Sequence, residues 1–225
     1  MLASVVPELA FLSARLMDPR TDFADGLTRC GWLDHSVDYV AYHDHEWGRP
    51  QADDRALFEQ LCLEGFQSGL SWRTILNKRA AFRRAFADFD MERVAGFDER
   101  RVEALLLDAG IVRHRGKIEA VINNARRALA LRDREGSLAA FFWRYEAPPR
   151  GADAPFEVLA STAESEALSK ALKKQGWSFV GPTTVYAFMQ SVGMVNDHHP
   201  LCHHHAACEQ ARYRFQRPDR EAPST

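Results

Sequence analysis

The sequence has no run of 18 apolar residues, almost no strand-like alternation of apolar and polar residues, and almost no net charge. The first absence argues against a membrane-spanning helix, and the second argues against a β-rich fold. With 29 basic and 31 acidic residues, the balanced charge excludes a uniformly basic coat for binding nucleic acid. Local basic patches remain compatible with this balance.

Cysteine is scarce as well, with four in 225 residues. Four could form two disulfides in a secreted protein, but a chain with 46% apolar residues can bury a core without them. The first 26 residues lack the basic start and the clean cleavage site of a signal peptide. We therefore expect reduced thiols and a cytoplasmic protein without a membrane partner.

Apolar residues recur with helical spacing through most of the chain. Asp53 or Asp54, Ser71 and Ser137 are of the residue types that cap helices, and each precedes such a segment. The helices predicted in this way lie at 54–66, 71–86, 102–109, 117–129, 138–142, 168–172 and 183–192. The fold class that the sequence predicts is all-α.

The domain organisation follows from where these patterns begin and end. Residues 29–208 are expected to form one domain, in which the proline-containing stretch 146–155 is expected to be a loop. A variable extension is expected over residues 1–28, and a flexible, polar tail over residues 209–225.

Two groups of cysteine and histidine lie near opposite ends of the chain. Cys30 and His43 are near the start, and His198 and Cys202 are near the end, four residues apart and therefore on one face of a helical turn. Two thiolates and two imidazoles are the ligand set of a closed, tetrahedral, structural zinc site. Such a site leaves no position for water, which argues against a catalytic metal.

Other residues of the same regions compete for this role, and spacing alone does not choose among them. The competing candidates are His45, His199, His203, His204, His205 and Cys208.

Longer motifs make the chain resemble a known family. They include Cys-Gly-Trp at 30–32, Tyr-His-Asp-x-Glu-Trp-Gly at 42–48, Leu-Glu-Gly-x-Gln-x-Gly-Leu-Ser-Trp at 63–72, Phe-Val-Gly-Pro-Thr-Thr at 179–184 and Met-Val-Asn-Asp-His at 194–198. These motifs, in this order, resemble the bacterial 3-methyladenine DNA glycosylase I family of the helix-hairpin-helix superfamily.

The resemblance implies a helical bundle with one structural zinc ion, held by Cys30, His43, His198 and Cys202, that ties the two ends of the domain together. It also implies a DNA repair enzyme, acting as a monomer on double-stranded DNA. The enzyme would flip out 3-methyladenine and release it as the free base by hydrolysis, without cutting the strand.

The resemblance places the base site at Glu64, as catalytic and base-contacting residue, with Tyr42, Trp47 and Trp72 lining the pocket. The chemistry is consistent, because adenine methylated at N3 is cationic and is attracted by aromatic faces and by a carboxylate. Each ring over a cation contributes about 0.5–2 kcal/mol. Without the motif, Glu64 would be interpreted as an exposed helix residue and the tryptophans as core side chains.

DNA contacts are expected around a hairpin at residues 175–184, where free amides at the start of a helix can bind a phosphate. The predicted DNA-binding residues are Gly181, Thr183, Lys170, Lys174, Arg115 and, as a wedge for the gap left by the flipped base, Leu70. Asp197 has two interpretations, as a catalytic aspartate or as a residue that orients the neighbouring His198.

Two other functions share part of this pattern. A zinc-stapled DNA-binding module without activity would have the hairpin and the metal site but would not need Glu64 beside aromatic rings. A metal-dependent hydrolase would use the histidine-rich segment 198–205 as its catalytic centre.

Overall fold

The computed structural model describes residues 18–148 and 156–218, and no strand occurs among them. The all-α class predicted from the sequence is confirmed. Within those two ranges, no helix has both the length and the apolar character needed to cross a membrane. The helices, in chain order, are α2 (Val37–His45), α3 (Asp54–Gln67), α4 (Trp72–Ala85), η1 (Ala87–Phe89), α5 (Met91–Ala95), α6 (Glu99–Leu107), α7 (Arg115–Glu135), α8 (Leu138–Phe142), η2 (Trp143–Tyr145), α9 (Ala163–Lys174), α10 (Pro182–Ser191) and α11 (His205–Arg214).

The capping residues expected from the sequence begin the helices they were assigned to. Asp53 accepts a hydrogen bond from the backbone N–H of Ala56 at the start of α3, and Ser71 accepts one from Thr74 at the start of α4. Ser137 caps α8 in the same way. Each cap satisfies one of the free N–H groups of the first helical turn.

Several boundaries differ from the prediction, α9 for example beginning at Ala163 rather than at 168, and two of the differences follow from side-chain hydrogen bonds. α6 ends at Leu107, before the expected stop at Gly110, because the carboxylate of Asp108 instead accepts from the N–H of Gly110 and turns the chain. α7 begins at Arg115 rather than after Gly116, because the imidazole of His114 caps it by accepting from the N–H of Lys117.

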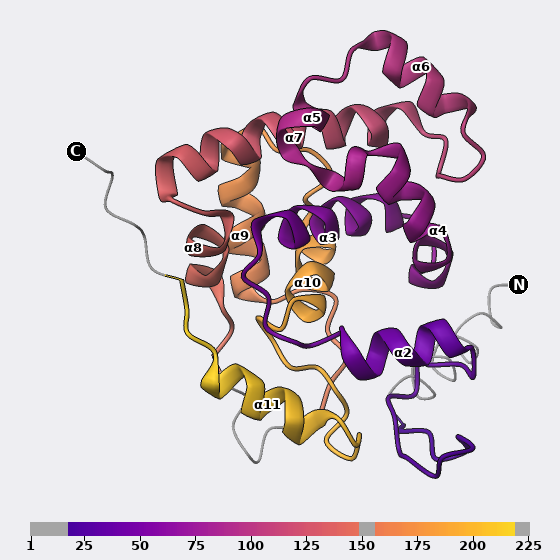
Figure 1. Ribbon diagram of the computed structural model, residues 1–225. Helices are drawn as coiled ribbons and strands as arrows, with labels where there is room; N and C mark the ends of the chain where they lie inside the picture. The colour runs from indigo at the N-terminus through magenta and orange to yellow at the C-terminus, as the bar shows by residue number, and fades with distance from the viewer. Residues whose placement is uncertain (1–17, 149–155, 219–225) are drawn as a thin grey trace, which may run out of the picture.

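α3 lies at the centre of the molecule and packs against α4, α7, α8 and α10 (Figure 1). Six consecutive residues of its C-terminal half, 61–66, are buried and contribute several of the most buried apolar side chains, so no face of this stretch is open to water. The same view shows α2 and α11, the first and last helices described, at the lower end, and α5, α6 and α7 at the upper end. A polar residue in the middle of α3 is therefore forced into the interior.

The turn between α9 and α10 is held rigidly. The side-chain amide of Asn124, from α7, donates to the carbonyl of Ser178 and accepts from its N–H, at 2.9 Å in each case. The hydroxyl of Ser169 donates to the carbonyl of Val180 at 2.6 Å. Between these anchors Phe179 adopts a left-handed φ of 56°, a conformation that an aromatic residue rarely adopts.

Part of the predicted flexible tail lies in a helix. Residues 209–214 belong to α11, and Arg212 in this helix is buried and donates to the carbonyls of Ala147 and Met194. The prediction rested on the polar, proline-containing composition of residues 209–225, which does not reveal that Arg212 is buried. Residues 1–17 and 219–225 of the predicted extension and tail lie outside the described residues.

The part of the N-terminal extension that the structure describes packs against the domain. Phe23 is buried, and the guanidinium of Arg29 lies 4.7 Å from the centre of its ring. An isolated bridge pairs Arg20 with Arg29. Cation–π contact and backbone pairing together hold this segment beside Cys30.

Candidate functional site: an aromatic pocket beside a cysteine–histidine cluster

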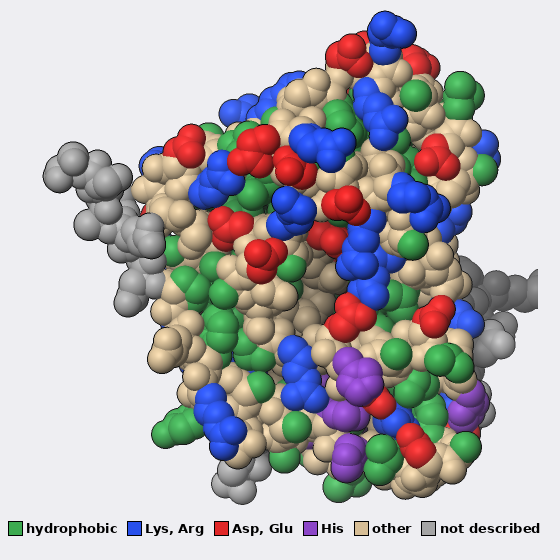
Figure 2. Space-filling view, in the orientation of Figure 1, with side chains coloured by type: hydrophobic (Ala, Val, Ile, Leu, Met, Phe, Trp, Pro, Cys, Tyr) green, Lys and Arg blue, Asp and Glu red, His purple; other side chains and the backbone are tan. Residues whose placement is uncertain are grey.

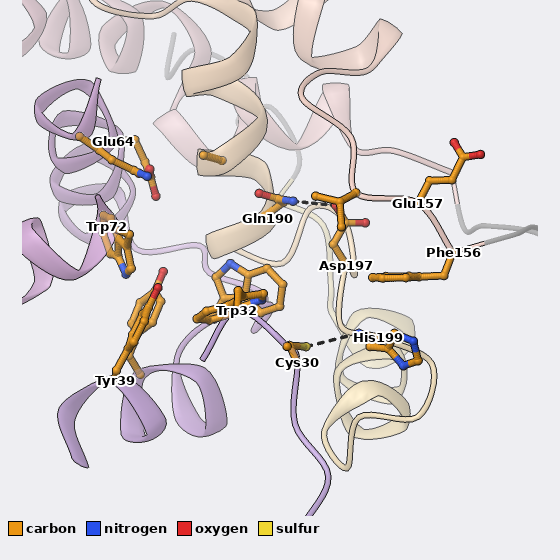
Figure 3. Close-up of a pocket in the computed structure, with 16 residues that line it drawn as sticks. Cys30, Trp32, Tyr39, Glu64, Trp72, Phe156, Glu157, Gln190, Asp197 and His199 are labelled. Carbon is orange, nitrogen blue, oxygen red and sulfur yellow. Dashed lines mark hydrogen bonds between the residues drawn. The ribbon is translucent and has the colours of Figure 1, made fainter. Parts of the chain in front are cut away.

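A cavity of about 260 Å³ opens between α2, α3, α4 and α10. Figure 3 shows Glu64, Trp72 and Tyr39 on one side of it, and Asp197, Phe156 and His199 on the other. Its full lining is Cys30, Gly31, Trp32, Tyr39, Tyr42, Trp47, Glu64, Gln67, Trp72, Phe156, Glu157, Val158, Ala187, Gln190, Asp197 and His199. The volume is close to the lower end of the range found for small-molecule sites.

Aromatic rings form most of the wall. The rings of Tyr42 and Trp72 have centroids 5.2 Å apart and an interplanar angle of 42°. Trp32 meets Trp47 nearly edge-on at 5.1 Å and lies 5.2 Å from Tyr39. Tyr39 and Tyr42 share one face of α2 because they are three residues apart. The result is a slot lined by electron-rich faces, which suits a flat ring that carries positive charge.

Glu64 is the buried carboxyl of this pocket, 4% exposed. Its Oε1 accepts a hydrogen bond from Nε2 of Gln60 at 2.8 Å, whereas its Oε2 is buried and has no hydrogen-bond partner among the described residues. Burial raises the pKa of Glu64 to about 8, so that in the empty pocket the group is mostly protonated at neutral pH. A buried polar atom without a partner is costly, and a ligand that supplies the partner recovers that cost.

The indole Nε1 of Trp72 is a second buried polar atom without a hydrogen-bond partner in the described part of the chain. It lies in the same cavity as Glu64 and is a donor only. The pocket therefore offers one N–H donor and one carboxyl oxygen beside aromatic faces. Both would be satisfied by a small heterocycle with ring nitrogens and amino groups.

Asp197 contributes to the opposite wall. Its Oδ2 accepts from the hydroxyl of Tyr186 at 2.5 Å and from Nε2 of Gln190 at 2.7 Å, the second of these bonds being drawn in Figure 3. Two neutral donors from α10 thus hold this carboxylate in place at the edge of the cavity. The structure puts Asp197 at the pocket as well as beside His198, so both interpretations of this residue remain predictions.

Cys30, His43, His198 and Cys202 come together as a buried group next to the pocket, with ligand atoms all within 4.8 Å of one another. The sulfur of Cys202 lies 3.6 Å from Nε2 of His43 and 3.5 Å from Nδ1 of His198, and the sulfur of Cys30 lies 3.6 Å from the same Nδ1. Sulfur and nitrogen ligands of one tetrahedral zinc ion are about 3.6 Å apart, as follows from bond lengths of about 2.3 and 2.05 Å. These four residues could hold a metal ion.

The neighbours of the two histidines determine which nitrogens face the cluster. Nδ1 of His43 is 2.7 Å from the carboxylate of Asp44, which Arg29 also binds through Nε and Nη2. Nε2 of His198 is 3.2 Å from the carbonyl of Trp47. With these nitrogens engaged, Nε2 of His43 and Nδ1 of His198 are left as ligand atoms, an arrangement typical of metal-binding histidines.

The two thiols of the cluster have unequal acidity. The hydrogen bond between them raises the pKa of Cys30 and lowers that of Cys202, which is consistent with one thiol and one thiolate in the absence of an ion. Thiolate is the form that binds metal.

Among the competing candidates, His204 is the one whose side chain belongs to a possible metal-binding group of the described residues. Its Nε2 is 3.2 Å from the carboxylate of Asp44, and together with His43 these residues form a second, smaller group. Histidine side chains gather in the lower half of the face shown in Figure 2, in the region of α2 and α11. No metal-binding group found among the described residues includes His45, His199, His203, His205 or Cys208.

Leu70 projects from the turn between α3 and α4 and is 43% exposed. The ammonium group of Lys117 donates to the carbonyls of Phe66 and Ser68, at 2.9 and 2.5 Å, and so fixes the end of α3. Gly69, with φ 79°, then turns the chain outward. The exposed leucine is thus held on a rigid turn, two residues before the pocket residue Trp72.

The predicted hairpin residues are accessible at the start of α10. Gly181 is its N-cap, and no atom lies within 4 Å of where a Cβ would be, so a ligand can approach the backbone closely. Thr183, Lys170 and Lys174 are exposed. Free N–H groups of the first turn and two lysines therefore face solvent in this part of the fold.

Arg115 has different surroundings. Its guanidinium is bound by the carboxylates of Glu99, Glu103 and Glu119. Basic and acidic side chains are interspersed across the upper half of the face in Figure 2. These carboxylates neutralise the positive charge of Arg115, and its DNA contact stays a prediction that its surroundings do not favour.

Several pocket residues were missed from the sequence. Tyr39 could have been found, because it precedes Tyr42 by three residues on one helix face. Gln67 follows Glu64 at the same spacing. Phe156 and Val158 carry no such signal, since they reach the cavity from a segment without helical pattern.

Comparisons with known proteins agree with this geometry. Residues 32–205 match the family described as methyladenine glycosylase. The chain is 49% identical over 175 residues to DNA-3-methyladenine glycosylase 1 of Escherichia coli (strain K12), a match that covers 76% of this chain and 94% of that protein. It is 45% identical over 174 residues to DNA-3-methyladenine glycosylase of Haemophilus influenzae, again covering 76% and 94%.

Solved structures give the same result. The fold is similar, with a TM-score of 0.75 and 49% identity, to a crystal structure of 3-methyladenine DNA glycosylase I, covering 79% of this chain and 99% of that one. It is also similar to 3-methyladenine DNA glycosylase I of Staphylococcus aureus, with a TM-score of 0.72, 36% identity and coverage of 76% and 93%.

Proposed function

Since the chain belongs to the methyladenine glycosylase family, we propose that it repairs alkylated double-stranded DNA by releasing 3-methyladenine as the free base. The observation that carries this proposal is the buried, unpartnered Oε2 of Glu64 in a pocket of aromatic rings. A normal base inside the duplex cannot reach such a cavity, so the target nucleotide must be flipped out of the stack.

The rings and the carboxyl recognise complementary properties of the lesion. An adenine methylated at N3 carries a positive charge, which attracts the faces of Tyr42 and Trp72 by about 0.5–2 kcal/mol per ring. The same charge favours the ionised form of Glu64, so the carboxyl gives up its proton when the cationic base enters. Oε2 then accepts a hydrogen bond from the base, and a neutral adenine gains neither effect to the same degree.

Catalysis follows from the same contacts. The bond between C1′ of the sugar and N9 of the base breaks, its electron pair stays with the departing base, and water adds to C1′ and loses a proton to the solvent. The methylated base is already a good leaving group, so the chain needs to bind it and stabilise the charge that develops nearby. No lysine is present among the described residues that line the pocket, and with no amine to form a Schiff base the enzyme would leave the strand uncut.

The cysteine–histidine cluster is proposed to hold one zinc ion. The ligand set of two sulfurs and two nitrogens, its burial and its spacing support zinc with four protein ligands. When bound, the ion would tie the segment before α2 to the segment before α11 and would take no part in the reaction. Cys30, His43, His198 and Cys202 would be its ligands.

DNA is proposed to lie across the α9–α10 hairpin and the α3–α4 turn. The N–H groups after Gly181 would bind a phosphate, while Lys170 and Lys174 would add non-specific attraction. Leu70 would fill the space that the flipped base leaves. A cytoplasmic location and a monomeric state remain predictions beside this proposal.

The test is release of free 3-methyladenine from methylated DNA, measured by chromatography, with wild type and the variant Glu64→Gln. We expect Glu64→Gln to lose about 10- to 100-fold in single-turnover rate, the usual effect of removing a hydrogen bond to a charged group. Glu59→Gln is the matched control, because Glu59 lies on the same helix but is ion-paired with Arg83 outside the pocket. No release by wild type would contradict the proposal and would favour a DNA-binding module without activity.

A further inference from the structure

Gln60 stands behind Glu64, on the side away from the base pocket. The two residues are four apart on α3, so their side chains lie on one face, and Nε2 of Gln60 is 2.8 Å from Oε1 of Glu64. Gln60 does not line the base pocket. It lines a second cavity of about 270 Å³, whose wall also includes Tyr42, Glu59 and Arg79.

This contact makes the two oxygens of Glu64 inequivalent. Gln60 is the one hydrogen-bond partner of this side chain in the described part of the chain, and it occupies Oε1 alone. An N–H that points at Oε1 leaves no room for a proton on the same oxygen. The proton of the neutral carboxyl is therefore on Oε2, and rotation of the carboxyl would cost the hydrogen bond.

We propose that Gln60 is a positioning residue for base excision: it locks the carboxyl of Glu64 so that Oε2, with its proton or its charge, always faces the flipped base. The inference rests on the function proposed above and deepens it. Without Gln60, either oxygen could face the base, and only some of the population would be ready to bind it. Groups that are held in place in this way accelerate the reaction, because they need not reorient as the transition state forms.

The amide of Gln60 also acts on the acidity of Glu64. Donation to Oε1 favours the ionised form and lowers the pKa of Glu64, against the larger effect of burial, which raises it. Other titratable groups surround this pair without hydrogen-bonding to Glu64. Tyr39 and Tyr42 from α2, whose pKa values are raised by burial and by Glu64, line the base pocket together with Cys30, Glu157, Asp197 and His199, whereas the second cavity beside Gln60 is lined by His45, Glu46, Arg49, Glu59, Arg79 and Arg83.

The test compares wild type with Gln60→Met, which keeps the length of the side chain but removes the N–H donor. The pKa of Glu64 is followed by ¹³C NMR of the carboxyl carbon, assigned by the absence of its signal in Glu64→Gln. We expect the pKa in Gln60→Met to lie about one pH unit above that of wild type, and the rise of kcat/KM with pH to move upward by the same amount. Gln210→Met, at an exposed position on α11, is the control for the substitution itself.

A purely structural role for Gln60 would lower the thermal midpoint and leave both pH profiles in place. An unchanged or lowered pKa of Glu64 in Gln60→Met would overturn the proposal, because it would mean that the amide does not donate to Oε1. Should Gln60→Met fail to fold, Gln60→Ala gives the same comparison with a smaller expected shift. The NMR titration needs no substrate, so it still decides the role of Gln60 if wild type releases no base.

Discussion

The indole of Trp47 lies nearly edge-on against the imidazole of His198, with ring centroids 4.6 Å apart, and its carbonyl is 3.2 Å from Nε2 of that histidine. Trp47 thus joins the cysteine–histidine cluster to the aromatic pocket, since its ring also packs against Trp32. The cluster supports a wall of the pocket, to which it also contributes Cys30. Disturbance of the cluster should therefore lower stability first and should affect base recognition only through this wall.

Removal of the metal should destabilise the protein before it changes the reaction. After treatment with a tight chelator, we expect the thermal midpoint to fall by roughly 10 °C or more, because the four buried ligands then lose the ion that joins the two ends of the domain. Base release per folded molecule, below the new midpoint, should fall by less than about tenfold. An unchanged midpoint with complete loss of activity would instead indicate a metal-dependent hydrolase.

Asp44 should control how tightly the metal is held. Its carboxylate fixes the Nδ1 hydrogen of His43, and we expect Asp44→Asn to weaken metal binding by about 10- to 100-fold in competition with a chromophoric chelator. Asp38→Asn, at an exposed position on the same helix α2, is the control. Equal metal affinities for the two variants would contradict the role given to Asp44.

Glu64 should make the folded state less stable as the pH rises. In the folded chain its pKa is about 8, whereas the ordinary value is 4.5, so between these values the folded state holds a proton that the unfolded state has lost. The contribution of the Glu64 carboxyl to the free energy of unfolding is fully present below pH 4.5. It decreases as the pH rises from 4.5 to about 8. Glu64→Gln should therefore be more stable than wild type at pH 8.5, by on the order of 2–4 kcal/mol in urea unfolding, and nearly equal at pH 4.5. A constant difference across this range would show that the carboxyl does not titrate in the folded chain as described.

The lysines of α9 should contribute to DNA affinity without sequence preference. We expect Lys170→Ala and Lys174→Ala each to reduce the slope of log affinity against log salt by about 1, as for the loss of one phosphate contact. Arg115→Ala should leave this slope unchanged, because three carboxylates already neutralise its charge. A larger change of this slope for Arg115→Ala than for Lys170→Ala would contradict the proposed position of the DNA.

The sequence predicts local features of this fold better than its long-range contacts. Ser71 and Asp53 predict the starts of their helices correctly, because a capping side chain bonds to an N–H group within the next three residues. Spacing could pair His198 with Cys202, but joining them to Cys30 required the resemblance, since 168 residues separate Cys30 from His198. The burial of Glu64 depends on helices that surround α3 on all sides, and no pattern within α3 itself reveals it.

The same limit applies to the surroundings of single side chains. Arg212 and Arg115 look alike in sequence, as basic residues of polar segments, but one is buried against backbone carbonyls and the other is surrounded by carboxylates. Gln60 is an ordinary helix residue until its distance to Glu64 is known. Tertiary contacts, rather than residue type, decide the role of each.

The most direct test of the account is the affinity of the chain for free 3-methyladenine against free adenine, measured by quenching of tryptophan fluorescence. Trp32, Trp47 and Trp72 all line the cavity, so a base that enters it must change their emission. We predict that 3-methyladenine binds wild type at least about tenfold more tightly than adenine, and that Glu64→Gln removes most of this difference. Equal affinities for the two bases, or a preference that Glu64→Gln leaves intact, would contradict the assignment of base recognition to Glu64 and its aromatic pocket.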